Sequence, residues 1–403
     1  MKKVIILYNF KGSAELEWLL PILFELKKNF FIFTVFKNKS AFNSLKNNNK
    51  NYIAWKKISK GTFIENKKHN FIFKLLIFLF KNFINSKYLL DKFRQKIYNT
   101  NTLTKIIKEN TNLKSFKISL FFSEFGYSSG WVDYLKKEGN IKIVHYPSNP
   151  QIYIEKWKRN YSLRGNILFL NSYIDKKMFS KIFKKKNIII SGNPKYDPHW
   201  INKFYKKVNT KNKIVIAYIS RFDAVDETYK KKLEKQLIDL IEILNKLDKE
   251  IIFKIHPTKN SIYYKILLNK YAKFKWTESK KNLIELTQNC LCLITHPYSS
   301  AGFDAIMNSR TVLQLWPIII DSEDEKQKLI KLNLYIREPS SYEKLNLITS
   351  TKSPDDFFKK IKLISNNKKK STVYSKIKKY YPPKKNTIGR ILSELEILQK
   401  NFR

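Results

Sequence analysis

Short apolar runs alternate with segments whose apolar residues recur every three or four positions, through most of the 403-residue chain. This alternation is typical of α/β domains, in which buried parallel strands are joined by crossover helices. Helical segments such as "ELEWLLPILFELKKN" separate the apolar runs of the first half. The pattern there predicts strands at 4–10, 30–36, 117–125, 141–147, 166–172 and 187–194.

The same pattern restarts after a polar, lysine-rich stretch around residues 201 to 212. It predicts a long helix over 227–249 and strands at 213–221, 250–257, 274–278, 291–297 and 311–317. We therefore expect two Rossmann-like, doubly wound domains, one at 1–205 and one at 206–365. A basic tail at 366–403 should end in a helix that packs back on the body.

Composition agrees with two cores, because 43% of the residues are apolar and 15% are aromatic. The formal net charge of +46 is spread along the whole chain. Such a charge bears on solubility and association rather than on fold, and it favours an anionic partner. A nucleotide, an acidic glycan and an anionic lipid are candidates, and a charge-driven nucleic-acid-binding protein is an alternative. No nucleic-acid-binding module is recognisable in the sequence.

Cysteine usage and apolar segments bear on the compartment. Only Cys290 and Cys292 are present, which fits a reducing compartment, and no Cys/His spacing suggests zinc. The apolar start lacks a cleavage site, so we interpret it as a strand. Segment 71–90 is interrupted by Lys74 and Lys81, so it is either a core helix or a helix on a membrane surface. We expect a cytoplasmic protein and leave peripheral association with the inner face of an anionic plasma membrane open.

Polar residues follow the predicted strands of the second half. His256 and Pro257 end one strand, Ser299 and Ser300 follow another, and Arg221 ends a third. A helix that begins near residue 300 offers free backbone N–H groups, so the serine pair can hold a phosphate. The alternative is that one serine is only an N-cap of the helix, and that the negative charge of Asp304 in the first turn interacts favourably with the helix dipole.

The combination of "KIHP" with "LIELTQNCLCLITHPYSSAGFDAIMNSRTVL" resembles the donor half of GT-B glycosyltransferases. The nearest resemblance is to the CDP-glycerol glycerophosphotransferase, capsule polysaccharide and bacterial sialyltransferase-like group. It implies that the two domains face a cleft, with the acceptor side on the domain at 1–205 and the donor side on the domain at 206–365. His256 and Pro257 would contact the donor nucleotide, and Ser299 and Ser300 would hold its phosphates. Asp304 would lie in the following helix, as in the "SS…FD" pattern of the glycerophosphotransferases.

A turn at the end of the first half is similar to the "TGYPRxD"-like turn that closes the first domain in these families. Its residues are Gly192, Asn193, Pro194, Lys195 and Asp197. The resemblance covers roughly residues 115 to 318. It departs from the family where "VHYPSNP" replaces "QHG" or "WHG", which affects the catalytic assignment, and where "THPYSS" replaces "TDYSS".

Transfer to a hydroxyl requires a base that removes its proton. His145 aligns with the catalytic-loop histidine of the family, and an imidazole titrates in the right range. Glu124 and Asp133 are carboxylate rivals near the end of another strand. The acidic residues at 321–325 are typical of a helix start, so we expect no metal site there. In place of a metal, Arg221 and Lys254 are candidates to neutralise a diphosphate.

The resemblance therefore implies a metal-independent bacterial transferase of cell-envelope synthesis, without a cofactor beyond its CMP-, CDP- or UDP-linked donor. It would move a glycosyl or glycerophosphate group to a hydroxyl of a surface polysaccharide, a lipid-linked glycan or a teichoic-acid-like acceptor. A sugar-nucleotide epimerase of the same fold is the alternative enzyme.

Overall fold

The computed structural model describes residues 1–9, 12–63, 98–125, 130–147, 165–179, 187–217, 227–254, 262–297, 299, 301–331, 340–366 and 373–400. They form two compact units. Unit 1 holds the described residues up to Ile201 and those from Tyr381 onward, and unit 2 holds those from Asn202 to Tyr380. The predicted segment 71–90 lies outside the described residues. Within the described ranges, no helix is long and apolar enough to cross a bilayer.

Unit 1 is built on a seven-stranded parallel sheet of order β3-β2-β1-β4-β5-β6-β7. The strands are β1 (Lys2–Asn9), β2 (Phe31–Phe36), β3 (Ser59–Phe63), β4 (Phe116–Glu124), β5 (Lys142–Tyr146), β6 (Ile167–Leu170) and β7 (Ile188–Ile190). All six strands expected from the apolar runs are present, some of them shorter. The strand β3 was not predicted, because its sequence SKGTF has a single large apolar residue and lies at the edge of the sheet.

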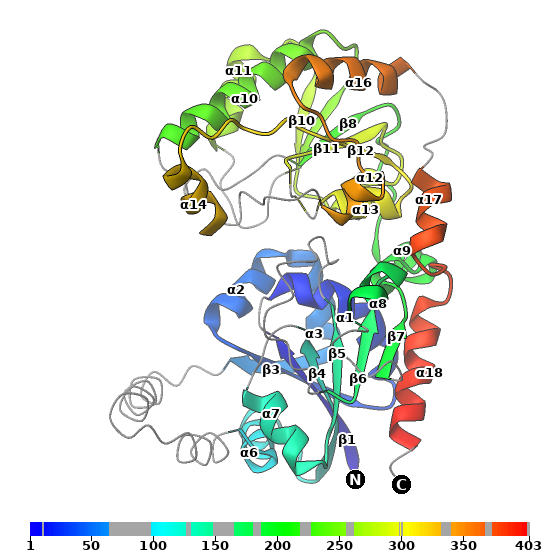
Figure 1. Ribbon diagram of the computed structural model, residues 1–403. Helices are drawn as coiled ribbons and strands as arrows, with labels where there is room; N and C mark the ends of the chain where they lie inside the picture. Colours follow the sequence, from blue (N-terminus) through cyan, green and yellow to red (C-terminus); the bar gives the residue numbers. More distant parts are fainter. Residues whose placement is uncertain are drawn as a thin grey trace. The chain divides into compact units, whose positions relative to one another are not determined.

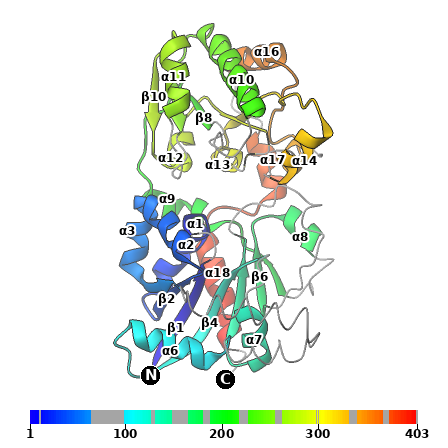
Figure 2. The same ribbon diagram turned by 90° about the vertical axis from the view of Figure 1, so that its left-hand side faces the viewer.

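Helices cover both faces of this sheet (Figures 1 and 2). One face packs against α6 (Thr100–Asn110) and α7 (Gly130–Glu138), whose Leu103, Ile107 and Leu135 are fully buried. On the other face, Trp18 of α1 (Ser13–Leu26) stacks on Tyr146 of β5. The remaining elements are α2 (Lys39–Asn47), α3 (Asn49–Ile58), α8 (Tyr173–Phe179), the 3-10 turn η4 (Pro194–Tyr196) and α9 (Pro198–Phe204).

Unit 2 contains a five-stranded parallel sheet of order β10-β9-β8-β11-β12, which confirms the number of strands expected there. The strands are β8 (Ile214–Ala217), β9 (Ile251–Lys254), β10 (Trp276–Ser279), β11 (Cys292–Thr295) and β12 (Thr311–Gln314). One face of the sheet forms an apolar core with α10 (Glu227–Asn245), α11 (Ile262–Tyr271) and α16 (Pro354–Asn366). The further helices are α12 (Leu283–Thr287), α13 (Gly302–Met307), α14 (Glu323–Lys331), α15 (Ser341–Lys344) and α17 (Val373–Tyr380).

The terminal helix α18 (Thr387–Lys400) belongs to unit 1, where it packs against α1, as the sequence predicted. The predicted tail 366–403 is divided, because α17 belongs to unit 2. The backbone N–H of Ile388 donates to Asp197 Oδ2 at 3.1 Å, and Arg390 donates to the carbonyl of Ser191 at 2.9 Å. These bonds fix the start of α18 to the segment that follows β7.

Candidate active site

The strand orders place a topological switch point in each sheet. In unit 1 the order reverses between β1 and β4, and in unit 2 it reverses between β8 and β11. Ligands of open parallel sheets bind outside the carboxyl ends of the strands at such a point. The residues that follow β1, β4, β8 and β11 are therefore the first candidates for function in this fold.

Ser299 lies at the switch point of unit 2, four residues beyond the end of β11. Its Oγ accepts a hydrogen bond from the backbone N–H of Ala301 at 3.2 Å. Ser299 therefore caps the turn that leads into α13, and its hydroxyl proton remains available for a ligand. Asp304 lies in the first turn of α13, as predicted from the sequence.

A buried network anchors this loop to the body of unit 2. The Nε2 of His296 lies 3.0 Å from Oε1 of Gln236 on α10, and Gln236 Nε2 donates to the carbonyl of Trp316 at 2.6 Å. Burial lowers the pKa of His296 to about 4, against the raising effect of the Pro297 backbone. The imidazole is therefore neutral at physiological pH and holds the residues that precede Ser299 in place.

The remaining donor-side candidates, Arg221, His256, Pro257 and Ser300, lie outside the described residues. The strand that leads to His256 is present as β9, which ends at Lys254. The strand that leads to Arg221 is present as β8, next to β11. The carboxyl ends of β8 and β9 thus lie at the same edge of the sheet as the end of β11, and β8 is directly next to β11.

Glu124 is the last residue of β4, at the switch point of unit 1, and it is buried. It pairs in register with Tyr146 on β5. Burial raises the pKa of the Tyr146 hydroxyl well above its usual range, and the charges of Glu15 and then Glu124 raise it further. Both carboxylates therefore act on one hydroxyl at this edge of the sheet.

Sequence reasoning missed Glu15, which is fully buried in the first turn of α1, directly after the loop that leaves β1. That loop is held by Asn9, whose side chain accepts from the N–H of Gly12 at 2.6 Å and donates to its carbonyl at 3.0 Å. The available signal was the position of Glu15 just after the first strand. Its proximity to Glu124 follows only from the pairing of β1 with β4.

His145 lies inside β5 and is buried on the opposite face of the sheet from Tyr146. Its Nδ1 lies 3.2 Å from the carbonyl oxygen of Ser123. A Cβ at Gly165 would be 2.4 Å from the imidazole Cδ2, so the ring packs directly on the glycine backbone. Burial lowers the pKa of His145 to about 4, which keeps the ring neutral. Asp133, the other rival, lies in the first turn of α7.

Asp175 is a second acidic residue that sequence reasoning did not select. It is buried in the first turn of α8, directly beyond the end of β6, and its N–H donates to Ser172 Oγ at 3.1 Å. Burial raises its pKa to about 7, although hydrogen bonds from Ser172 and Asn171 oppose the shift. The neighbouring Asn171 accepts a bond from the indole of Trp18 at 3.0 Å, which ties this edge to α1.

The turn from Gly192 to Asp197 holds unit 1 together. Gly192 has φ of 83°, and Pro382 lies 3.2 Å from the position a Cβ would take, so a side chain would be strained there. Asn193 caps η4, which begins at Pro194, through the N–H of Lys195. Lys195 Nζ lies 3.4 Å from a carboxylate oxygen of Glu17 on α1.

The acidic stretch 321–325 lies at the start of α14, as predicted. Lys232 of α10 binds Asp321 and Glu325, each at 2.8 Å, so these carboxylates join α14 to α10. Across the described part of the chain, no three His, Cys, Asp or Glu side chains gather in a way that could hold a metal ion.

No protein-family model and no curated protein sequence matches the chain. Solved structures do match it over nearly its whole length. The UDP-GlcNAc 2-epimerase of Neisseria meningitidis, bound to UDP-GlcNAc, is 10% identical with a TM-score of 0.55, over 98% of this chain and 99% of that one. MurG of Acinetobacter baumannii is 10% identical with a TM-score of 0.54, over 98% and 99%. CalG4, the calicheamicin glycosyltransferase, is 9% identical with a TM-score of 0.54, over 98% of both chains.

At these identities the similarity concerns the fold alone. The two parallel α/β sheets, of seven and five strands, agree with it. The chain has the two-domain GT-B fold.

Proposed function

We propose that this protein transfers a glycosyl or glycerophosphate group from a nucleotide-activated donor to a hydroxyl of a surface polysaccharide, a lipid-linked glycan or a teichoic-acid-like acceptor. The observation that carries the proposal is the position of Ser299 and Glu124. Each lies at the switch point of its own sheet, where this class of fold binds ligands. The donor nucleotide is a substrate, and no separate cofactor is required.

Unit 2 would bind the donor. The hydroxyl of Ser299 would donate to a phosphate oxygen of the nucleotide, while its lone pair keeps the bond from Ala301. The network of His296 and Gln236 would hold the loop in that geometry. His256, Pro257 and Ser300 would complete the nucleotide site, and Arg221 would neutralise the departing phosphate. The solved structures bound to UDP and to UDP-GlcNAc support a nucleotide ligand for this fold.

Unit 1 would supply the base, and its geometry favours Glu124 over His145. The imidazole of His145 lies inside a strand, against Gly165 and the carbonyl of Ser123, with a pKa of about 4. Glu124 ends its strand at the switch point, where an acceptor hydroxyl would arrive. Its carboxylate would take the proton as the acceptor oxygen attacks the donor carbon or phosphorus, and the bond to the leaving nucleotide breaks.

The donor site is tested by nucleotide binding. Binding of CMP, CDP, UDP and GDP to the purified protein would be measured by calorimetry, before and after Ser299→Ala. Loss of one hydrogen bond to a charged group should lower the affinity for the nucleotide about tenfold. Ser322→Ala is the matched control, because Ser322 also caps a turn, through the N–H of Glu325, and follows the edge strand β12 rather than a strand at the switch point. Equal affinities of the two variants would contradict the assignment.

The base is tested by turnover with the best nucleotide-linked donor. Glu124→Gln should lower kcat by at least about a hundredfold, because a general base contributes 10²–10⁴ in rate. Nucleotide affinity should stay unchanged, since Glu124 belongs to unit 1. His145→Gln should alter stability more than kcat. Full activity of Glu124→Gln would show that Glu124 is not the general base.

A sugar-nucleotide epimerase is the second candidate, and one observation favours it. Glu15 and Glu124 place two buried carboxylates at one edge of unit 1, and an epimerase needs several acidic and basic groups around the sugar. Product analysis without an acceptor separates the two functions. Conversion of the free nucleotide sugar to its epimer would establish the second candidate, whereas a product that forms only with an acceptor would establish transfer.

A further inference from the structure

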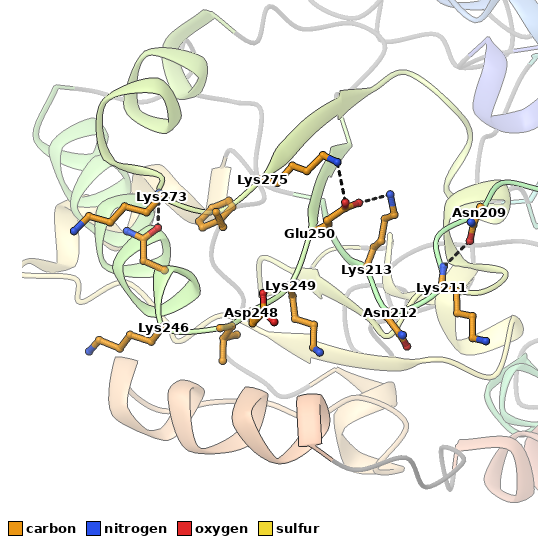
Figure 3. Close-up of a pocket in the computed structure, with 13 residues that line it drawn as sticks. Asn209, Lys211, Asn212, Lys213, Lys246, Asp248, Lys249, Glu250, Lys273 and Lys275 are labelled. Carbon is orange, nitrogen blue, oxygen red and sulfur yellow. Dashed lines mark hydrogen bonds and ion pairs between the residues drawn. The ribbon is translucent and has the colours of Figure 1, made fainter.

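A hollow of about 1050 Å³ opens at the amino ends of the strands of unit 2, the opposite edge of the sheet from Ser299 (Figure 3). It lies where the chain enters β8, β9 and β10, so turns from three separate parts of the sequence form its wall. Lys213, Glu250 and Lys275 each directly precede one of these strands. The hollow belongs to unit 2 alone and shares no residue with the candidate active site.

Its lining is much richer in lysine than the chain as a whole. Six of the thirteen lining residues are lysines, whereas Lys and Arg together make up 79 of the 403 residues of the sequence. Three further lining residues are asparagines, which can also donate hydrogen bonds. The concentration at this site is therefore more than the general basic character of the protein accounts for.

Two carboxylates, Asp248 and Glu250, also line the hollow and neutralise part of this charge. Glu250 forms ion pairs with Lys213 and, at 3.1 Å, with Lys275, and these two bonds lower its pKa. Lys246 lies over the ring of Phe358, with 5.4 Å between Nζ and the ring centroid. The ammonium groups of Lys211, Lys249 and Lys273, which also line the hollow, form no ion pair with any carboxylate of the described residues. In Figure 3 the side chain of Lys249 lies between those of Lys211 and Lys273, which extend toward opposite sides.

The wall of the hollow is held by the fold. Asn245, the last residue of α10, accepts from the N–H of Lys273 at 2.7 Å and donates to the carbonyl of Tyr271 at 3.0 Å. The carbonyl of Glu250 accepts from the N–H of Ile214, and that of Lys275 accepts from the N–H of Ile251. The three turns are thus fixed to one another, and the spacing of the lysine backbones does not have to be organised by a ligand.

We propose that this hollow binds an anion that carries two or more phosphate groups, at a site separate from that of the donor. The six lysines of the lining outnumber its two carboxylates, Asp248 and Glu250, by four, which provides charge for more than one phosphate, and Asn209 and Asn212 can donate to the remaining oxygens. A volume near the upper end of the range for small-molecule sites suits an extended anion rather than a single phosphate. The lining lacks exposed large apolar residues, which a membrane-inserting surface would need.

The test measures binding of inorganic triphosphate to the full chain by calorimetry at low ionic strength. Lys249→Ala/Lys273→Ala should raise the Kd roughly tenfold, because two charge contacts are lost. Lys235→Ala/Lys359→Ala, which removes the same charge from exposed helix positions of unit 2, is the matched control and should change little. Lys249→Arg/Lys273→Arg should retain binding, which separates loss of charge from loss of folding.

Further binding measurements, with another variant and with other anionic ligands, test where the phosphate groups bind and what carries them. Ser299→Ala should leave the affinity that depends on Lys249 and Lys273 unchanged. Phosphatidylglycerol carries one phosphate per headgroup, so vesicle binding that the Ala double variant loses, without any triphosphate binding, would overturn the proposal. If the Ala double variant and its control weaken triphosphate binding equally, the proposal is wrong. Binding of single-stranded RNA that both variants weaken equally, with no triphosphate binding, would also overturn it.

Discussion

The immediate surroundings of the two buried histidines, His145 and His296, determine their protonation state. His145 and His296 are both neutral because they are buried, and each has a ring nitrogen within hydrogen-bond distance of an oxygen acceptor. A neutral, enclosed imidazole positions its neighbours and exchanges no proton at physiological pH. His145, which the family resemblance selected as a candidate base, and His296, which it did not select, therefore have similar environments.

The packing of His145 on Gly165 predicts a coupled pair. Gly165→Ala should destabilise unit 1 by about 1–3 kcal/mol, the usual cost of overpacking, because the new methyl group would meet the imidazole. In the His145→Ala background the same change should cost little, because the ring is gone. Denaturant unfolding of the four proteins measures the coupling. Additive effects would mean that the ring and the glycine do not contact each other in solution.

The pKa of His296 predicts a pH dependence. Its folded-state pKa of about 4 is below the unfolded value near 6.5, so between these values only the unfolded state takes up the proton. This group therefore lowers stability as pH falls from about 6.5 to about 4. His296→Gln should be destabilised relative to wild type at pH 7, and the difference should shrink by about 2 kcal/mol at pH 4.5. Urea titrations at both pH values check this, and a constant difference would refute it.

At the scale of elements, Asp197 connects two helices. Its Oδ1 accepts from the N–H of His199 at the start of α9, and its Oδ2 accepts from Ile388 at the start of α18. Asp197→Ala should lower the free energy of unfolding by about 1–2 kcal/mol, because each helix loses a cap. Asp197→Asn should lose less, because its amide oxygen still caps one helix. Thermal unfolding followed by circular dichroism compares the two variants, and indistinguishable midpoints would contradict a capping role.

The elements also show what sequence patterns can and cannot predict. Strands such as β4 and β11 contain short apolar runs, LFF and CLI, that are buried on both faces of the sheet, and the sequence predicted them. The polar residues at their carboxyl ends indicated two candidates, Glu124, the last residue of β4, and Ser299, which follows β11. The role of Glu15 could not be predicted in this way, because its relation to Glu124 depends on which strands pair. Strand order arises from contacts between residues more than one hundred positions apart.

For the whole molecule, charge is the dominant property. A formal charge of +46 makes the folded chain repel itself, and salt screens that repulsion over about 8 Å at physiological ionic strength. We expect added sodium chloride to raise the thermal midpoint by roughly 2–4 °C, as for about 1 kcal/mol of stabilisation. Calorimetry over a salt series measures it. Potassium chloride at equal ionic strength should act alike, and a midpoint that falls with salt would contradict the expectation.

The return of α18 to unit 1 has a consequence for how the chain is made. Residues of α18 such as Ile388, Ile391 and Leu395 are buried in unit 1, although they are synthesised after all of unit 2. Until they leave the ribosome, the apolar surface of α1 that they cover stays open to solvent and to chaperones. Unit 2 has its whole sequence available earlier, so it can complete its fold first, the reverse of the usual order for nascent domains.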